Sequence, residues 1–136
     1  MKFKKLAVVL AAAGVAAAAT GCADVNMQGI ITPVHGAQIV ASITTEVTQR
    51  PKAYEAYIDL QVYVNGVWQT EDETLVTMAN LGQHITLRAN CVAAGPSQVE
   101  KWRLFIRQNG VDSQGVGIAQ TNYEPSADGV RIRCEA

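Results

Sequence analysis

The sequence predicts an all-β domain, a sandwich of about seven antiparallel strands or a small barrel, after an N-terminal signal peptide. Three observations predict it. Apolar and polar residues alternate with a period of two along residues 38–136, turn signals separate the alternating runs, and no run has the 3.6-residue period of a helix. The chain has 136 residues, 49% of them hydrophobic, which suits a single domain of this kind.

The first segment, residues 1–21, is typical of a secretory signal peptide. Three lysines lie within the first five residues, and residues 6–19 are all small or apolar. This run is shorter than the roughly 20 residues that a membrane-spanning helix needs, and it lacks the polar side of a surface helix. We therefore expect the protein to be exported.

The end of this segment, Ala19-Thr20-Gly21-Cys22, resembles the lipobox of bacterial lipoproteins, whose cysteine receives a diacylglyceryl group and becomes the first residue. Ala19 departs from the motif, because leucine is usual there. The resemblance implies a membrane anchor on Cys22 in the bacterial cell envelope, since two acyl chains suffice for stable attachment. Ordinary cleavage after the preceding alanines would instead give a soluble periplasmic or secreted protein with a free thiol.

Residues 22–37 have no clear period and contain Gly29, Pro33 and Gly36, so we expect a lipidated tether or a loose first strand. One domain then spans residues 38–136. The alternating or β-branched runs that predict its strands are residues 38–48, 54–64, 67–69, 74–78, 85–91, 101–107, 116–118 and 130–134.

Turn signals divide these runs. Asn65-Gly66 predicts a two-residue hairpin, because both central residues of such a turn need a positive φ. Asn109-Gly110 is expected to end the strand before it. Glu71-Asp72-Glu73 offers oxygen ligands for Ca²⁺, but bound Ca²⁺ takes about 6–8 oxygens from several segments. We therefore interpret this triplet as a solvated hairpin end.

The three cysteines, an odd number in an exported chain, require an explanation. Lipidation of Cys22 leaves Cys91 and Cys134, which share the parity of the apolar residues in their strands and so point at the core. A disulfide between them would stabilise the fold by roughly 4 kcal/mol on the chain-entropy model. Trp102 has the same parity and is expected to pack on it. The alternative is two buried free thiols.

The series Cys91, Trp102 and Cys134 resembles the Cys–Trp–Cys core of immunoglobulin domains. The resemblance implies an immunoglobulin-like sandwich architecture. The topology should differ, because about four predicted strands precede Cys91 and Ile132 stands where those domains have a tyrosine. The resemblance carries no binding residues with it.

No catalytic motif is present. The two histidines, His35 and His84, have no carboxylate partner nearby in sequence, and the usual zinc spacings and G-x-S-x-G are absent. We therefore predict a protein that is not an enzyme and uses no cofactor or metal. A small exported hydrolase or enzyme inhibitor stays open as an alternative, because catalytic triads assemble in space.

Charge is segregated along the chain. Beyond the signal segment, eight Lys and Arg face twelve Asp and Glu, a net charge of −4 that disfavours nucleic acid as a partner. Residues 22–84 have a net charge of −5 and residues 85–136 a net charge of +1. All six Lys and Arg residues of the second part occupy outward positions in their predicted strands. They are Arg88, Lys101, Arg103, Arg107, Arg131 and Arg133.

These cations have two interpretations. Outward charges commonly deter pairing at sheet edges. Alternatively, they form a docking face for an anionic envelope polymer or an acidic protein. Tyr57, Tyr63 and Phe105 also lie off the core parity, and exposed tyrosines are suited to contacts. We place the candidate binding surface on these three residues and the six cations.

Together these features predict a non-catalytic, lipid-anchored binding or structural module of the cell envelope. A phage- or prophage-encoded lipoprotein that excludes further infection is another possibility that the small size permits.

Overall fold

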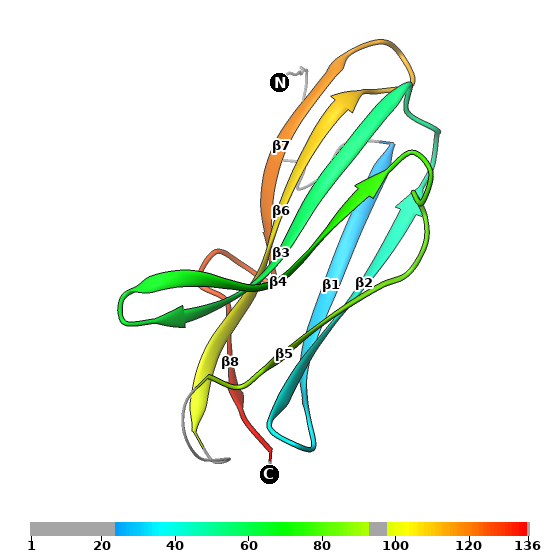
Figure 1. The fold of residues 1–136 in the computed structure, drawn as a ribbon. Coiled ribbons are helices and arrows are strands. Elements are labelled where there is room, and N and C mark those ends of the chain that lie inside the picture. The colour runs from blue at the N-terminus through cyan, green and yellow to red at the C-terminus, as the bar shows by residue number, and fades with distance from the viewer. Residues whose placement is uncertain (1–23, 93–97, 136) are drawn as a thin grey trace.

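The computed structural model describes residues 24–92 and 98–135 (Figure 1). The predicted signal peptide and Cys22 lie outside the described residues. Eight strands form two antiparallel sheets. They are β1 (Val25–Val34), β2 (Gln38–Val47), β3 (Ala53–Val64), β4 (Val67–Thr77), β5 (Ile85–Asn90), β6 (Val99–Val111), β7 (Gly117–Glu124) and β8 (Val130–Arg133).

The small sheet has the order β1-β2-β5 and the large sheet the order β4-β3-β6-β7, with β8 paired to the same side of β6 as β7. Neither sheet closes on itself, so the predicted sandwich is confirmed and the small barrel is not observed. No helix of the described residues is long and apolar enough to cross a membrane.

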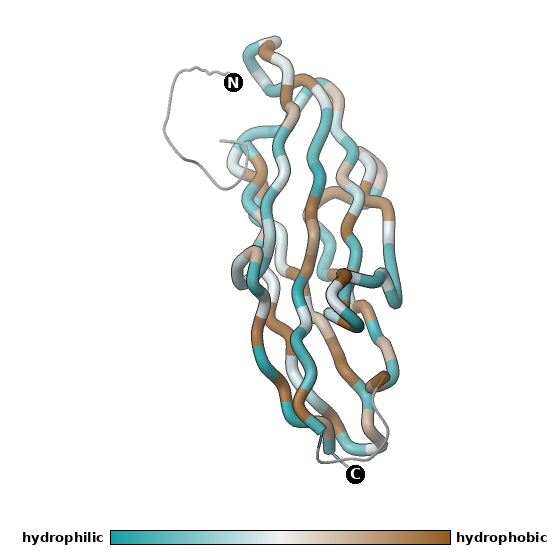
Figure 2. Tube along the Cα trace, turned by 90° about the vertical axis from the view of Figure 1, so that its left-hand side faces the viewer, coloured by the Kyte–Doolittle hydropathy of each residue, from teal (hydrophilic) through white to brown (hydrophobic). Residues whose placement is uncertain are grey.

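The core lies between the sheets and is built by the alternation seen in the sequence. Figure 2 shows hydrophobic and hydrophilic residues following one another along the strands. Every second residue points inward, and full burial of such an aliphatic side chain contributes about 1.5–3 kcal/mol. The inward residues with no exposed surface in β2, β3 and β6 are Ile39, Ala41, Ile43, Ala56, Ile58, Leu60, Val62, Trp102, Leu104 and Ile106.

The first correction concerns where the domain begins. Of the two expectations for residues 22–37, the structure shows a first strand: β1 pairs with β2 over its whole length and buries Val25 and Met27, so the domain begins before residue 38. Gly29 interrupted the apolar pattern. It occupies an inward position where a Cβ would collide with Leu104, so packing requires a residue without a side chain.

The second correction concerns β4. The Asn65-Gly66 hairpin is confirmed, with φ of 53° and 83° and Val64 opposite Val67. The strand then continues to Thr77 instead of stopping. Leu60 pairs with Asp72 and Gln61 with Thr70, so Glu71 is the extra residue of a β-bulge. The acidic triplet therefore belongs to an edge strand and not to a hairpin end.

The strand β6 also extends beyond its predicted end. Asn109-Gly110 lies inside β6 and does not end it. Gly110 lets the backbone of Ala53 on β3 come so close that a Cβ at this position would collide with it, and the pairing of the two strands continues. Likewise β7 is longer than residues 116–118. Its inward residues after Ile118 are Gln120 and Asn122, whose polarity concealed the alternation.

The predicted disulfide is present. Cys91 and Cys134 are bonded, with their Cα atoms 6.4 Å apart, and they follow β5 of the small sheet and β8 of the large sheet. The bond therefore ties the two sheets together. Trp102 lies on β6 beside β8 and is fully buried, as its parity predicted.

Candidate interaction surface

Aromatic side chains gather on one outer face of the molecule. Of the seven aromatic residues in the described part of the chain, Tyr54 and Trp102 are buried in the core. Register pairs such as Tyr63 with Trp68 and Phe105 with Tyr123 place the rest together on the outer face of the large sheet. The five are Tyr57, Tyr63, Trp68, Phe105 and Tyr123.

Cations from β6 lie between these rings and complete a continuous series of contacts, which we call the aromatic–cation ladder. Its members in order of contact are Lys101, Tyr63, Trp68, Arg103, Tyr123, Phe105, Arg107 and Tyr57. Successive distances, measured to ring centroids, are 4.6, 5.2, 4.1, 4.4, 5.1, 5.2 and 5.1 Å. Each cation is within the range of favourable cation–π contact.

Arg103 is the centre of the ladder and has a structural role. Its guanidinium lies between the rings of Trp68 and Tyr123. Its Nε donates to Gln61 Oε1 at 2.8 Å and its Nη1 to the carbonyl oxygen of Ala127 at 2.7 Å. Partial burial lowers the pKa of this guanidinium, and Tyr123 opposes the shift. Arginine still remains charged near neutral pH.

Arg107 is more open to solvent. Its side chain is 44% exposed, and Nη2 lies 3.9 Å from the Oδ2 atom of Asp59. Asp59 is largely buried and also accepts a hydrogen bond from the hydroxyl of Thr70 at 3.4 Å. The carboxylate therefore fixes the inner side of the guanidinium while its outer side remains available to a ligand.

The position of β6 bears on the two interpretations of the cations. It pairs with β3 on one side and with β7 and β8 on the other, so Lys101, Arg103 and Arg107 do not protect an edge. Arg131 and Arg133 extend the cationic row onto β8. Eight of the nine predicted surface residues thus share one face. Arg88 is the exception, because β5 places it on the small sheet.

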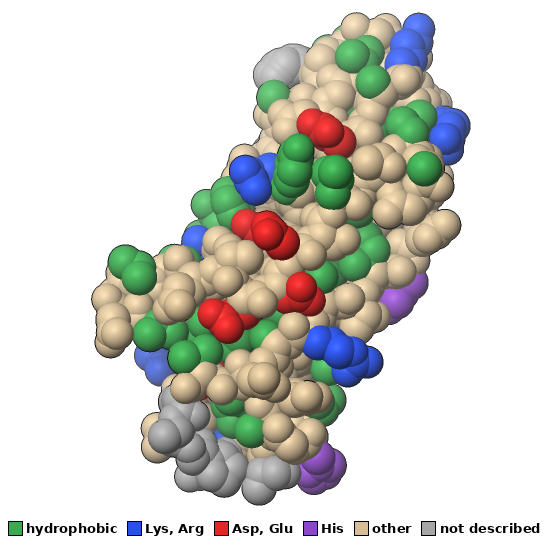
Figure 3. Space-filling model, viewed as in Figure 1, with side chains coloured by type: hydrophobic (Ala, Val, Ile, Leu, Met, Phe, Trp, Pro, Cys, Tyr) green, Lys and Arg blue, Asp and Glu red, His purple; other side chains and the backbone are tan. Residues whose placement is uncertain are grey.

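Acidic residues border the ladder. Figure 3 shows Asp and Glu side chains in the middle of the side on which β4 lies. Glu71 and Glu73 of β4 are exposed, whereas Asp72 accepts hydrogen bonds from the backbone N–H groups of Arg88 at 3.0 Å and Glu73 at 2.9 Å. An anionic partner would therefore be repelled by β4 and attracted along β6 and β8.

A cleft opens at the end of the ladder that begins with Lys101, between the β3–β4 hairpin and the strands β6 and β8. Its volume is about 590 Å³. The lining residues combine apolar walls, a ring, two cations and a carboxylate: Val62, Tyr63, Val64, Asn65, Val92, Val99, Glu100, Lys101 and Arg131.

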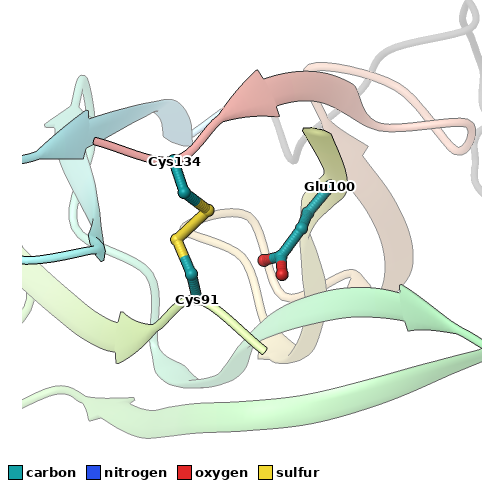
Figure 4. A group of neighbouring side chains, drawn as sticks. All are labelled: Cys91, Glu100 and Cys134. Atoms are coloured by element: carbon teal, nitrogen blue, oxygen red, sulfur yellow. A yellow bond between two sulfur atoms is a disulfide. The ribbon is translucent and has the colours of Figure 1, made fainter. Parts of the chain in front are cut away.

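Glu100 is a buried carboxylate that the sequence analysis did not identify. It is 7% exposed and its Oε1 accepts a hydrogen bond from the indole N–H of Trp102 at 3.1 Å. Figure 4 shows its carboxylate directed toward the disulfide. Glu100 thus lies beside both the indole of Trp102 and the Cys91–Cys134 bond. The sequence did hold one signal for its burial, because Glu100 stands two residues before Trp102 and so shares the inward face of the strand.

This cluster has the donor types of a metal site, since ligand atoms of Cys91, Glu100 and Cys134 lie within 4.8 Å of one another. The two sulfurs are bonded to each other, however, and zinc requires thiolates. In the disulfide form the cluster therefore lacks the donors of a structural zinc site.

One contact bears on hydrolase chemistry. Ser42 Oγ and His84 Nε2 are 3.0 Å apart on the outer face of the small sheet. All Asp and Glu side chains belong to the described residues, and none of them forms an ion pair with His84 within 4.0 Å. The other histidine, His35, lies 3.5 Å from Glu135. The described residues therefore supply two members of a triad without the third.

Comparisons with protein-family models, with curated proteins and with solved structures find no match for this chain. The binding chemistry of the surface follows from its own side chains. The ladder presents ring edges, guanidinium and ammonium groups to solvent, because the faces of most of its rings are covered by neighbouring members. Such a surface suits a partner that is rich in acceptors and negative charge.

Proposed function

We propose that this protein is a non-catalytic, lipid-anchored binding module of the bacterial cell envelope and that the aromatic–cation ladder is its interaction surface. The ladder is the observation that carries the proposal. The fold itself needs only small polar residues on an outer face. Five rings and three central cations in mutual contact are instead typical of interaction sites, where aromatic residues and arginine are enriched.

The ladder also supplies the rigidity that binding requires. A free arginine or lysine side chain loses rotational freedom when a partner immobilises it, at a cost of about 0.5–1.5 kcal/mol. Contacts with Tyr57 and Phe105 already restrict Arg107, and contact with Tyr63 restricts Lys101. Part of that cost is therefore met on folding.

The proposed anchor fits the position of β1. If Cys22 is the lipidated first residue, only two residues separate it from Val25, a reach of about 10 Å. The domain would then stand on the membrane by the end at which β1 begins. The cleft lies near the opposite end, because Cys91, next to the lining residue Val92, donates its backbone N–H to Ala37, just beyond the far end of β1. The cleft would therefore be the part of the binding surface farthest from the protein's own membrane.

Affinity capture tests the interaction. Full-length lipoprotein, extracted from membranes and immobilised, should retain a polymer or protein from envelope extracts. Arg107→Gln should abolish retention, whereas Arg88→Gln, a matched change on the small sheet, should leave it intact. Failure of the unaltered protein to retain any envelope component, or equal retention by the Arg107→Gln variant, would contradict the proposal.

Intact mass spectrometry tests the anchor separately. The membrane-extracted protein should have the mass of a chain that begins at a diacylated Cys22. A mass for an unmodified chain that begins at Thr20 would remove the anchor and leave a soluble exported module.

The Ser42–His84 contact supports a second candidate function, a small exported hydrolase. Activity on ester substrates that is lost in Ser42→Ala would establish it. Absence of activity in the unaltered protein would favour the binding module.

A further inference from the structure

We propose that the cleft between the β3–β4 hairpin and the strands β6 and β8 binds an acidic sugar unit of an envelope polysaccharide. The inference rests on the proposed function and names the chemistry of the partner. Lys101 and Arg131 would bind the sugar carboxylate, and the exposed amide of Asn65 would form hydrogen bonds with its hydroxyl groups.

The cations at the cleft form an uncompensated pair. Lys101 and Arg131 are direct partners in the antiparallel register of β6 and β8, and like charges in opposite positions destabilise a sheet. Every Asp and Glu side chain belongs to the described residues, and none lies within 4.0 Å of the charged atoms of Lys101 or Arg131. An external anion between the two cations would supply the missing negative charge.

The carboxylate of Glu100 selects among anions. It lines the same cleft from the inner side of β6 and is held in place by the indole of Trp102. Charge repulsion would weaken the binding of a ligand that offers only negative oxygens, such as polyphosphate. A sugar acid instead carries a single carboxylate for the two cations, and its uncharged hydroxyl groups are not repelled by Glu100.

The remaining walls suit the same ligand. Val64 and Val99 provide apolar surface for the C–H groups of a sugar ring, and Tyr63 adds a polar-tipped aromatic side chain. The volume of about 590 Å³ lies within the usual range of sites for small ligands.

The location of the cleft favours a unit within a polymer over an isolated small molecule. The cleft lies at the Lys101 end of the ladder. Arg107 lies six residues along β6 from Lys101, a distance of about 20 Å. A linear acidic polysaccharide seated in the cleft could therefore extend along the ladder and meet a further cation. A single acidic sugar would contact only the cleft.

Calorimetric titration of the full-length protein in detergent provides the test, at constant ionic strength. Three probes of similar length would be compared: an oligouronate, a neutral oligosaccharide and polyphosphate. We expect the oligouronate to bind at least tenfold more tightly than either of the others. Lys101→Gln combined with Arg131→Gln should weaken oligouronate binding at least tenfold, while Arg88→Gln should not change it.

Stability of the variants gives a second readout. Because Arg131→Gln removes one of two opposed like charges without removing a ladder contact, this ligand-free variant should unfold at a temperature equal to or above that of the unaltered protein. A lower unfolding temperature would show that the pair is structural and would overturn the inference. If the double variant does not fold, each single substitution should still weaken oligouronate binding.

The outcomes separate this inference from the proposed function. Equal affinity for polyphosphate and oligouronate, or binding that survives the double substitution, would overturn the cleft assignment. Retention of an envelope component that depends on Arg107 would still support the binding module in that case. Loss of all retention by the unaltered protein would overturn both.

Discussion

The two outer faces of the sandwich arise from the same alternation but differ in composition. Outward residues of the small sheet are mostly Asn, Gln, Ser and Thr, with no aromatic ring among those described. The large sheet presents five rings and five cations on its outer face. The small sheet shows that uncharged polar side chains are sufficient for a solvent-facing side of this fold. The additional chemistry of the large sheet therefore requires a reason outside the fold.

The disulfide gives the largest expected effect, because it decides whether the two faces belong to one cooperative unit. Replacing Cys91 and Cys134 with alanine should lower the free energy of unfolding by roughly 4 kcal/mol. Chemical denaturation, followed by circular dichroism and by tryptophan fluorescence, measures this. Two separate transitions in the unaltered protein would contradict the expectation that both sheets unfold together.

Arg103→Ala is expected to have the next largest effect and tests the ladder directly. It removes two cation–π contacts and two hydrogen bonds, each worth about 0.5–1 kcal/mol, so the free energy of unfolding should fall by about 2–4 kcal/mol. Arg88→Ala on the small sheet should change it by less than about 0.5 kcal/mol. Equal effects of the two substitutions would remove the distinction between the faces.

Asn122→Val should have a smaller effect of opposite sign. Asn122 is buried on the inner side of β7, and neither polar atom of its side chain has a hydrogen-bond partner among the described residues. Replacing it with an apolar residue of similar size should raise the free energy of unfolding by about 1 kcal/mol. Destabilisation on urea titration would show that an ordered water satisfies the amide.

Tyr57→Thr should have the smallest effect on stability, because it converts the end of the ladder into the kind of residue found on the small sheet. Tyr57 has one ladder contact, to Arg107, so the free energy of unfolding should change by less than about 1 kcal/mol. Retention of envelope components should nevertheless weaken. Unchanged retention would exclude this end of the ladder from the interaction surface.

Parity alone predicts a large part of this structure. The alternating runs identified β2, β3, β5, β6 and β8, and inward parity brought Cys91 and Cys134 together. The same reasoning failed where an inward position is not apolar. Gly29 left β1 undecided between a tether and a strand, and Asn122 concealed the length of β7, because a close approach and a buried amide leave no hydrophobic signal.

The candidate surface was predictable only in part. Outward parity identified six of the eight ladder members and the two cations of β8, but Trp68 and Tyr123 were missed. Trp68 could have been found, because a two-residue turn at Asn65-Gly66 sets it opposite Tyr63. Tyr123 could not, because its place beside Phe105 depends on the pairing of β6 with β7, and distant strand pairing is not written in a local pattern.

Footprinting by hydroxyl radicals tests the central claim most directly, since it needs no variant and uses the protein in its own envelope. Modification of Tyr57, Tyr63 and Tyr123 should be strongly reduced in envelope preparations relative to the purified protein. Ile30 on the small sheet, whose side chain is 67% exposed, should be modified equally in both. Equal modification of the three tyrosines in both samples, or protection confined to Ile30, would contradict the assignment of the ladder as the interaction surface.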